Sequence, residues 1–145
     1  MKKYLVIGNP IEHSLSPELH NYWIKNNVIK ATYEKMKITN VQIKNLISEI
    51  KNGKINGLNI TVPFKQEVIP HLDHLSDEAN KTQSVNTILL KDDKTVGHNT
   101  DIEGFEYSVK FNNIDLKNKN IFIMGAGGVV PSIIYALNKM QVSNI

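Results

Sequence analysis

The segment Tyr4-Leu5-Val6-Ile7-Gly8-Asn9-Pro10 decides how the fold begins. Four apolar residues that end at a Gly-Asn-Pro turn are typical of a short buried strand that runs into a loop. Ser16-Pro17-Glu18 then predicts the start of a helix, because it offers an N-cap, a first-turn proline and a first-turn acid. Strands and helices alternate in this way along the chain, which predicts an α/β protein.

Apolar periodicity and turn residues predict the remaining elements. Between Asn40 and Gly53 the apolar residues have helical spacing, which predicts an amphipathic helix that the glycine ends. The helix that begins at Ser16 carries an apolar face and is expected to place Trp23 in the core. The predicted strands cover residues 4–7, 32–38, 57–62, 84–90, 95–98 and 121–124, and the other predicted helices cover residues 76–79, 101–109 and 129–140.

Residues 112–120 are polar and rich in lysine, and they mark a predicted domain boundary. Residues 1–112 form the first predicted domain. Residues 113–145 contain a predicted strand, a glycine loop and a predicted helix, which together are the first β-α unit of a Rossmann-type domain. One such unit cannot form a doubly wound sheet, so we expect this second domain to be incomplete in the chain.

Composition excludes several classes of function. The 145 residues include 17 lysines, no arginine and 14 acidic residues, for a formal net charge of +3, and the lysines are dispersed rather than clustered as a nucleic-acid surface requires. The chain has no cysteine, which excludes disulfides and thiolate metal sites, and His71 and His74 have too few neighbouring ligands to predict a metal site. No apolar run approaches the ~20 residues of a membrane span or the ~7–15 of a signal peptide. We therefore expect a cytoplasmic protein with neither a nucleic-acid nor a membrane partner.

The segment Gly125-Ala126-Gly127-Gly128 lies between a predicted strand and a predicted helix. Glycines at this place let backbone N–H groups and the helix dipole approach a pyrophosphate, so we predict a dinucleotide site that extends to Val129. The third glycine of the full fingerprint would fall at Val130, and a plain tight turn remains an alternative.

Other polar residues stand beside predicted element ends. Ser14 and Ser16 precede a helix and can donate hydrogen bonds to a carboxylate, or serve only as caps. Lys65 follows a predicted strand, where an isolated lysine is more often a solvated surface cation. Asp101 begins a predicted helix, where an acid is also a common cap. None of these residues decides a function when it is considered alone.

Taken together, five motifs resemble the shikimate dehydrogenase family over essentially the whole chain. They are GNPIEHSLSPELHN at residues 8–21, GLNITVPFK at 57–65, VNT at 85–87, GHNTDIEG at 97–104 and GAGG at 125–128. The resemblance implies a substrate domain of mixed sheet and helices, an NADP-binding Rossmann domain, and an active site in the cleft between them. It also implies reversible, NADPH-dependent reduction of 3-dehydroshikimate to shikimate in aromatic amino acid biosynthesis.

The resemblance also implies roles for individual residues. Lys65 matches the catalytic lysine, and Asp101 is paired with it. Asn59 matches a supporting position in the same pocket. The implied substrate-binding residues are Ser14, Ser16, Thr61, Lys65, Asn86 and Asp101, and the implied cofactor-binding residues are Gly125, Ala126, Gly127, Gly128 and Val129.

These roles agree with elementary chemistry. Hydride reduction of a ring carbonyl creates an oxygen that needs a proton, which a lysine ammonium can donate while it stabilises the developing charge. A neighbouring aspartate holds the lysine in place and favours its charged form. Serine hydroxyls can orient a carboxylate without an arginine, which this chain does not contain.

Two departures from the family pattern lead to further expectations. Gln83-Ser84 stands where the family usually has Gly-Ala, so we expect a different turn before Asn86. The chain resembles roughly the first half of such an enzyme. The alternatives are a shikimate-binding module without catalysis and a quinate/shikimate dehydrogenase, although the paired serines favour shikimate. The expected partner is a small-molecule substrate, and a homodimer is left open.

Overall fold

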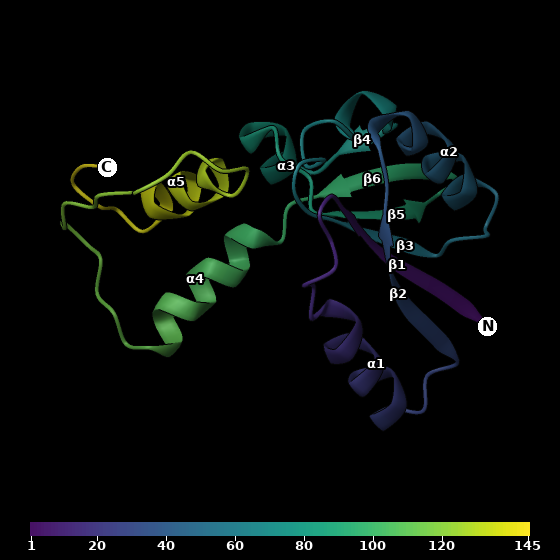
Figure 1. The fold of residues 1–145 in the computed structure, drawn as a ribbon. Coiled ribbons are helices and arrows are strands. Elements are labelled where there is room, and N and C mark those ends of the chain that lie inside the picture. The colour runs from purple at the N-terminus through teal and green to yellow at the C-terminus, as the bar shows by residue number, and fades with distance from the viewer.

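The structure is a computed structural model that describes residues 1–145, and it contains one six-stranded mixed sheet in the order β2-β1-β3-β5-β6-β4 (Figure 1). The central strand β1 is parallel to β2 and β3, while β5 is antiparallel to both β3 and β6. The short β4 is parallel to β6. The strands are β1 (Lys2–Gly8), β2 (Ala31–Lys37), β3 (Gly57–Ile60), β4 (His74–Leu75), β5 (Thr87–Lys91) and β6 (Lys94–His98). The predicted α/β class with a mixed sheet and flanking helices is therefore confirmed.

One edge of the sheet collects the chain segments that carry the candidate site residues. The strands β1, β3 and β6 run in the same direction, so the loops that follow them emerge at the same edge. β5 runs the opposite way, so the residue before it, Asn86, also lies at this edge. Ligands of open α/β sheets commonly bind outside the carboxyl ends of the parallel strands.

The core lies between the sheet and α2 (Asn40–Lys51), which covers one face of the sheet (Figure 1). A capping box fixes the start of α2, because the Thr39 N–H donates to Gln42 Oε1 at 2.8 Å. The predicted apolar spacing places its buried side chains on a single face. They are Ile43, Leu46, Ile47 and Ile50, and they pack with Leu5, Ile7, Leu58, Ile60, Phe64 and Ile88.

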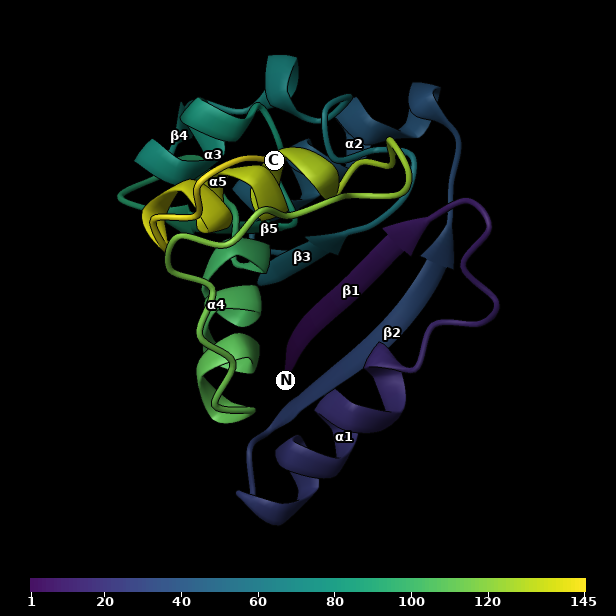
Figure 2. The ribbon, with the colours of Figure 1, turned by 90° about the vertical axis from the view of Figure 1, so that its left-hand side faces the viewer.

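The other helices are α1 (Ser16–Asn26), α3 (Asp77–Thr82), α4 (Asp101–Phe111) and α5 (Val130–Lys139), with a 3₁₀ turn η1 (Ile69–His71). α1 lies alongside β2 on the sheet face opposite α2, and α4 and α5 pack against each other beside the sheet (Figures 1 and 2). The proposed division at residues 112–113 stays a prediction. α4 from its first part contacts α5 from its second.

The expected burial of Trp23 is wrong. The residue is 47% exposed, and α1 contains no buried residue. α1 contacts the sheet at its edge strand β2, and of its apolar residues only Ile24 packs against the small cluster of Val6, Ile11 and Tyr33. The rest of the predicted apolar face has no neighbouring layer to cover it.

The predicted strand at residues 121–124 does not form a ladder. Asn120 makes a single parallel bridge with Asn144, and the Ile121 N–H donates to the Asn144 carbonyl at 2.9 Å. Phe122 and Met124 are almost fully exposed. A parallel strand is stabilised by neighbours on both sides and by helices over both faces, and residues 113–145 supply neither. The predicted helix after it does form, as α5. None of the helices is both long and apolar enough to span a bilayer.

Candidate active site

Lys65 and Asp101 form an ion pair at the edge of the sheet that collects the candidate site residues. Lys65 lies in the turns that follow β3, Asp101 is the first residue of α4, and the distance from Lys65 Nζ to Asp101 Oδ2 is 2.6 Å. The two side chains are only 12% and 24% exposed. Lys65 is therefore not a solvated surface cation, and the structure brings the two predicted catalytic residues together.

Asn86 orients the carboxylate of this pair. Its Nδ2 donates to Asp101 Oδ1 at 2.8 Å, while its Oδ1 accepts from the Thr100 N–H at 3.0 Å. Each oxygen of Asp101 thus has its own donor, Lys65 on one side and Asn86 on the other. The N-terminus of α4 also favours negative charge at this position.

A cavity of about 290 Å³ lies at the ends of β1 and β3, and its lining includes Ser14, Ser16 and Thr61. Gly8 allows the two loops to approach, since an added Cβ there would lie 2.6 Å from Thr61 Cγ2. Ser14 Oγ also accepts a long hydrogen bond of 3.4 Å from the Ser16 N–H, so one serine contributes to the start of α1 as well. The two serines predicted to bind a carboxylate are thus neighbours, and Thr61 lines the same cavity.

Tyr33 is connected to Asn86 through Asn59, and sequence reasoning did not predict this connection. Its hydroxyl donates to Asn59 Oδ1 at 2.7 Å, and Asn59 Nδ2 in turn donates to the Asn86 carbonyl at 3.2 Å. Burial raises the pKa of Tyr33 to about 12, although the hydroxyl of Ser16 acts in the opposite direction. The strand pattern predicts Tyr33 as an apolar position, and it contains no sign that the hydroxyl has a hydrogen-bond partner. The supporting role of Asn59 in the pocket stays a prediction.

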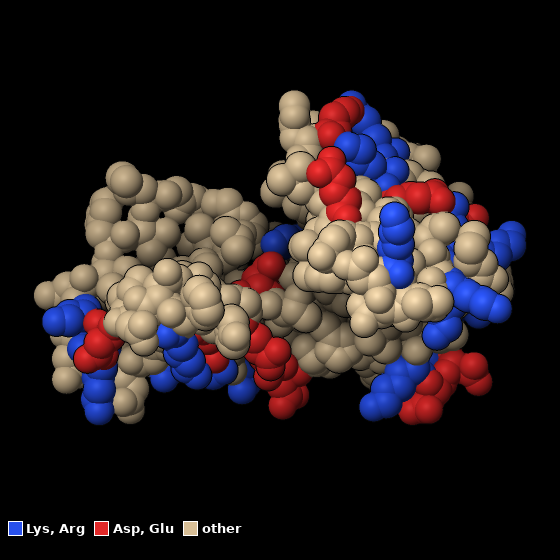
Figure 3. All heavy atoms as spheres, turned by 90° about the horizontal axis from the view of Figure 1, so that it is seen from below, with Lys and Arg blue, Asp and Glu red and all other residues tan.

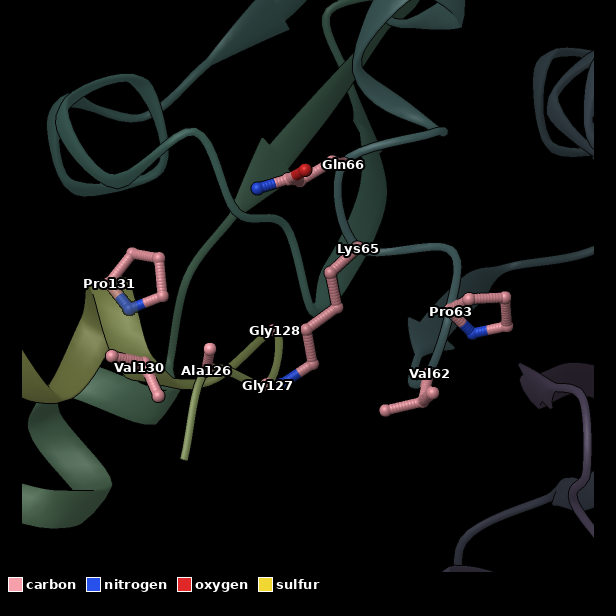
Figure 4. Close-up of a pocket in the computed structure, with 9 residues that line it drawn as sticks. All are labelled: Val62, Pro63, Lys65, Gln66, Ala126, Gly127, Gly128, Val130 and Pro131. Carbon is pink, nitrogen blue, oxygen red and sulfur yellow. The ribbon is translucent and has the colours of Figure 1, made fainter. Parts of the chain in front are cut away.

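The predicted glycine loop faces Lys65 across a cavity of about 390 Å³ (Figure 4). One wall comes from Val62, Pro63, Lys65 and Gln66, and the other from Ala126, Gly127, Gly128, Val130 and Pro131. The Lys65 side chain extends between the two walls toward the glycines (Figure 4). A space-filling view from below shows a hollow between the two lobes of the molecule, with a positive and a negative side chain side by side in it (Figure 3).

The glycine loop has the open backbone that a phosphate group requires. Gly125 has a φ of +122°, which side chains rarely adopt, and nothing lies within 4 Å of a Cβ added at Gly127. Gly127 also accepts a hydrogen bond from the Val130 N–H at 2.9 Å, which starts α5 directly after the loop. Val129 flanks this helix start, but it does not line the cavity.

Comparison with known proteins identifies the family of the chain. Residues 6–88 match the family model of the shikimate dehydrogenase substrate binding domain. The chain belongs to the shikimate dehydrogenase family. It is 58% identical over 144 residues to the shikimate dehydrogenase (NADP(+)) of Pelagibacter ubique, covering 99% of this chain and 54% of that protein. It is 44% identical to the Staphylococcus aureus MSSA476 enzyme of the same name, covering 94% of this chain and 51% of that protein.

Solved shikimate dehydrogenases share the fold. The Aquifex aeolicus enzyme superposes with a TM-score of 0.92 at 39% identity, and the match covers 99% of this chain and 54% of that one. The Thermus thermophilus enzyme in complex with NADP(H) and shikimate superposes with a TM-score of 0.90 at 30% identity, with the same coverage. The chain therefore spans about half the length of the relatives that it matches.

Gln83 and Ser84 form the turn that leads from α3 toward Asn86, and a different turn from that of the family stays a prediction. Gln83 caps α3 in the left-handed conformation, with φ of 49° and ψ of 41°, which glycine adopts more easily. Ser84 is fully buried, and its hydroxyl donates to the Gly128 carbonyl at 3.3 Å. The Ser84 side chain therefore contacts the glycine loop.

Proposed function

We propose that the whole protein is an NADP-dependent shikimate dehydrogenase, which reversibly reduces 3-dehydroshikimate to shikimate in the biosynthesis of aromatic amino acids. The observation that carries this proposal is the Lys65–Asp101 pair, with 2.6 Å between Nζ and Oδ2, beside a cavity whose far wall is the glycine loop. Family membership and the names of the relatives support it. Both reactants are diffusible small molecules, and the proposal places the protein in the cytoplasm.

The proposed mechanism assigns proton transfer to Lys65. When NADPH is bound, it supplies the hydride that reduces the ring carbonyl carbon. The Lys65 ammonium donates a proton to the carbonyl oxygen, so that the alcohol forms as the lysine becomes neutral. Asp101 keeps Nζ in place and favours the charged lysine before the reaction. In the reverse direction the neutral lysine accepts the alcohol proton.

The proposed substrate site spans both cavities. The hydroxyls of Ser14 and Ser16 hold the substrate carboxylate, and Thr61 makes another contact with the substrate. Asn86 and Asp101 hold ring hydroxyls. Asn86 is suited to this role because its amide is fixed by Thr100 and Asp101 and cannot rotate freely. A substrate held in this way lies between the serines and Lys65.

The proposed cofactor site is the loop from Gly125 to Val129. The fit rests on the open space beside Gly127 and on the loop's position at the N-terminus of α5. The backbone N–H groups and the dipole at a helix N-terminus favour an anion. The preference for NADP comes from the names of the relatives.

The test uses a completed chain, in which residues 1–145 are joined to the C-terminal part of the Pelagibacter ubique relative. We expect NADP⁺ reduction, followed at 340 nm, with shikimate as the substrate. Slower turnover with quinate would support the assignment, whereas faster turnover with quinate would favour the quinate alternative. Shikimate binding by a folded completed chain without any turnover would favour the non-catalytic alternative.

A further inference from the structure

Three buried side chains join the Asp101 helix to the glycine-loop helix. Asn99 precedes α4, Thr82 is the last residue of α3, and Ser132 lies in the first turn of α5. Asn99 Nδ2 donates to Thr82 Oγ1 at 2.9 Å and to Ser132 Oγ at 2.8 Å. All three side chains are buried. We call these residues the Asn99 cluster.

The hydrogen bonds fix which way the Asn99 amide points. Thr82 Oγ1 donates its proton to the Glu78 carbonyl at 2.7 Å, so toward Asn99 it can only accept. The NH₂ group of Asn99 must therefore face the hydroxyls. Its Oδ1 is left to accept from the Asp101 N–H, at 3.1 Å. A single amide thus contacts both the start of α4 and the start of α5.

Directional contacts of this kind hold α5 in a way that apolar packing does not. Ala136 and Leu137 are buried on the apolar side of α5. Apolar contacts of this kind have no fixed direction, so they tolerate small shifts of the helix. A buried hydrogen bond is lost when its donor and acceptor separate, and it leaves an unpaired polar group behind. Ser84 adds a second directional contact, from its hydroxyl to the Gly128 carbonyl.

We propose that Asn99 is a positioning residue, which sets the placement of the glycine loop relative to the Lys65–Asp101 pair. This inference rests on the proposed function, since the loop is where the cofactor would bind. Hydride transfer requires reacting atoms about 3–3.5 Å apart, and a misplacement of ~1 Å costs up to ~10²-fold in rate. Asn99 acts through Asp101 on one side and through Ser132 on the other, without touching a reactant.

The test measures hydrogen exchange in the 145-residue chain, which needs no turnover. Ser132→Ala removes a hydroxyl from α5, more than thirty residues away from Asp101 in sequence. We expect the Asp101 and Val130 amides to exchange at least ~5-fold faster, while amides of β1 keep their rates. Ser108→Ala, at an exposed serine of α4, is the matched control. Unchanged exchange at Asp101 in folded Ser132→Ala would overturn the proposal.

A second pair of variants separates positioning from simple loss of structure. Thr82→Val keeps the side-chain shape and removes the hydroxyl, whereas Thr82→Ser keeps the hydroxyl. In the completed chain we expect Thr82→Val to lower kcat ~10-fold with little change in shikimate KM, and Thr82→Ser to restore it. Equal kcat values in an active completed chain would count against the proposal. An inactive unsubstituted chain would instead refute the proposed function and leave the exchange result to decide on Asn99.

Discussion

Lys65 becomes chemically distinctive through its neighbours rather than through its own sequence position. The turn after β3 withdraws its ammonium from solvent, and α4 supplies the carboxylate that compensates its charge. A buried cation needs such a partner, because desolvation without one is costly. The burial of the Lys65 ammonium therefore depends on the Asp101 carboxylate beside it.

Replacing Lys65 tests the proton-transfer role. In the completed chain we expect Lys65→Ala to lower kcat ~10²–10⁴-fold, the usual contribution of a general acid, with a smaller effect on shikimate KM. Lys54→Ala, at an exposed lysine, should leave both constants unchanged. A loss confined to KM would assign Lys65 to binding alone.

Tyr33 offers a prediction that is independent of activity. Its raised pKa, near 12, means that the folded protein keeps the Tyr33 proton between about pH 10 and 12, where the unfolded chain releases it. Stability is therefore expected to fall as the pH rises through this window. An ultraviolet titration of the five tyrosines should show one late transition, which Tyr33→Phe abolishes and Tyr22→Phe, at an exposed tyrosine, retains.

The Tyr33→Phe variant should also be less stable. Removal of its hydroxyl leaves Asn59 Oδ1 without its donor, at an expected cost of about 1–2 kcal/mol in the free energy of unfolding, measurable by urea denaturation. A variant as stable as the unsubstituted chain would show that water replaces the lost donor.

Among the elements, β4 is the shortest strand, and a side chain reinforces its backbone pairing with β6. Asp73, just before it, accepts hydrogen bonds from the Thr95 N–H at 2.7 Å and from Thr95 Oγ1 at 2.8 Å, and it pairs with Lys51 of α2 at 2.8 Å. One carboxylate thus connects a strand start, a neighbouring strand and a helix end.

This clamp predicts an acid-sensitive stability. The bond to Lys51 and those from Thr95 hold the pKa of Asp73 well below its ordinary value of 3.8. A lowered carboxyl pKa stabilises the fold above the ordinary value, and this contribution is lost as the pH falls below it. We expect Asp73→Asn to flatten the pH dependence of unfolding below about pH 4, whereas Asp115→Asn, at an exposed aspartate, should not. Parallel acid curves for Asp73→Asn and the unsubstituted chain would contradict this role.

The elements also show where sequence reasoning succeeds. α2 was predictable because a single apolar stripe faces a single layer, and β1 because an apolar run ends in strong turn residues. The predicted burial of Trp23 was wrong, since periodicity reveals an apolar face but not whether another layer covers it. The strand at 121–124 has strand-like residues, yet a ladder depends on neighbours that a local pattern does not contain.

For the whole molecule, the candidate site depends on contacts between distant segments. The order of the motifs predicted Lys65, Asn86 and Asp101 as site residues. Only the topology of the sheet explains why their side chains meet. The hydrogen bonds of the Asn99 cluster and of Tyr33 were not predicted, because polar residues that bond to each other across elements leave no local signature.

The 145-residue chain should behave differently from the completed chain. Because it carries the serine group and the Lys65–Asp101 pair, we expect it to bind shikimate weakly, as measured by calorimetry, and to oxidise it slowly or not at all with NADP⁺. Vigorous turnover by this chain would contradict the expectation. Ser14→Ala should weaken the binding, whereas Ser48→Ala, at an exposed serine of α2, should not.

The shared direction of β1, β2 and β3 has a practical consequence for handling the protein. Their opposite ends, near Met1, Lys30 and Gly53, lie at the far rim of the sheet. Gly53 has open space around it, so a cysteine placed nearby, such as Lys54→Cys, offers a lone thiol in a chain that has none. A dye or a biosensor chip coupled there leaves the edge of the sheet that carries the candidate site facing the solution.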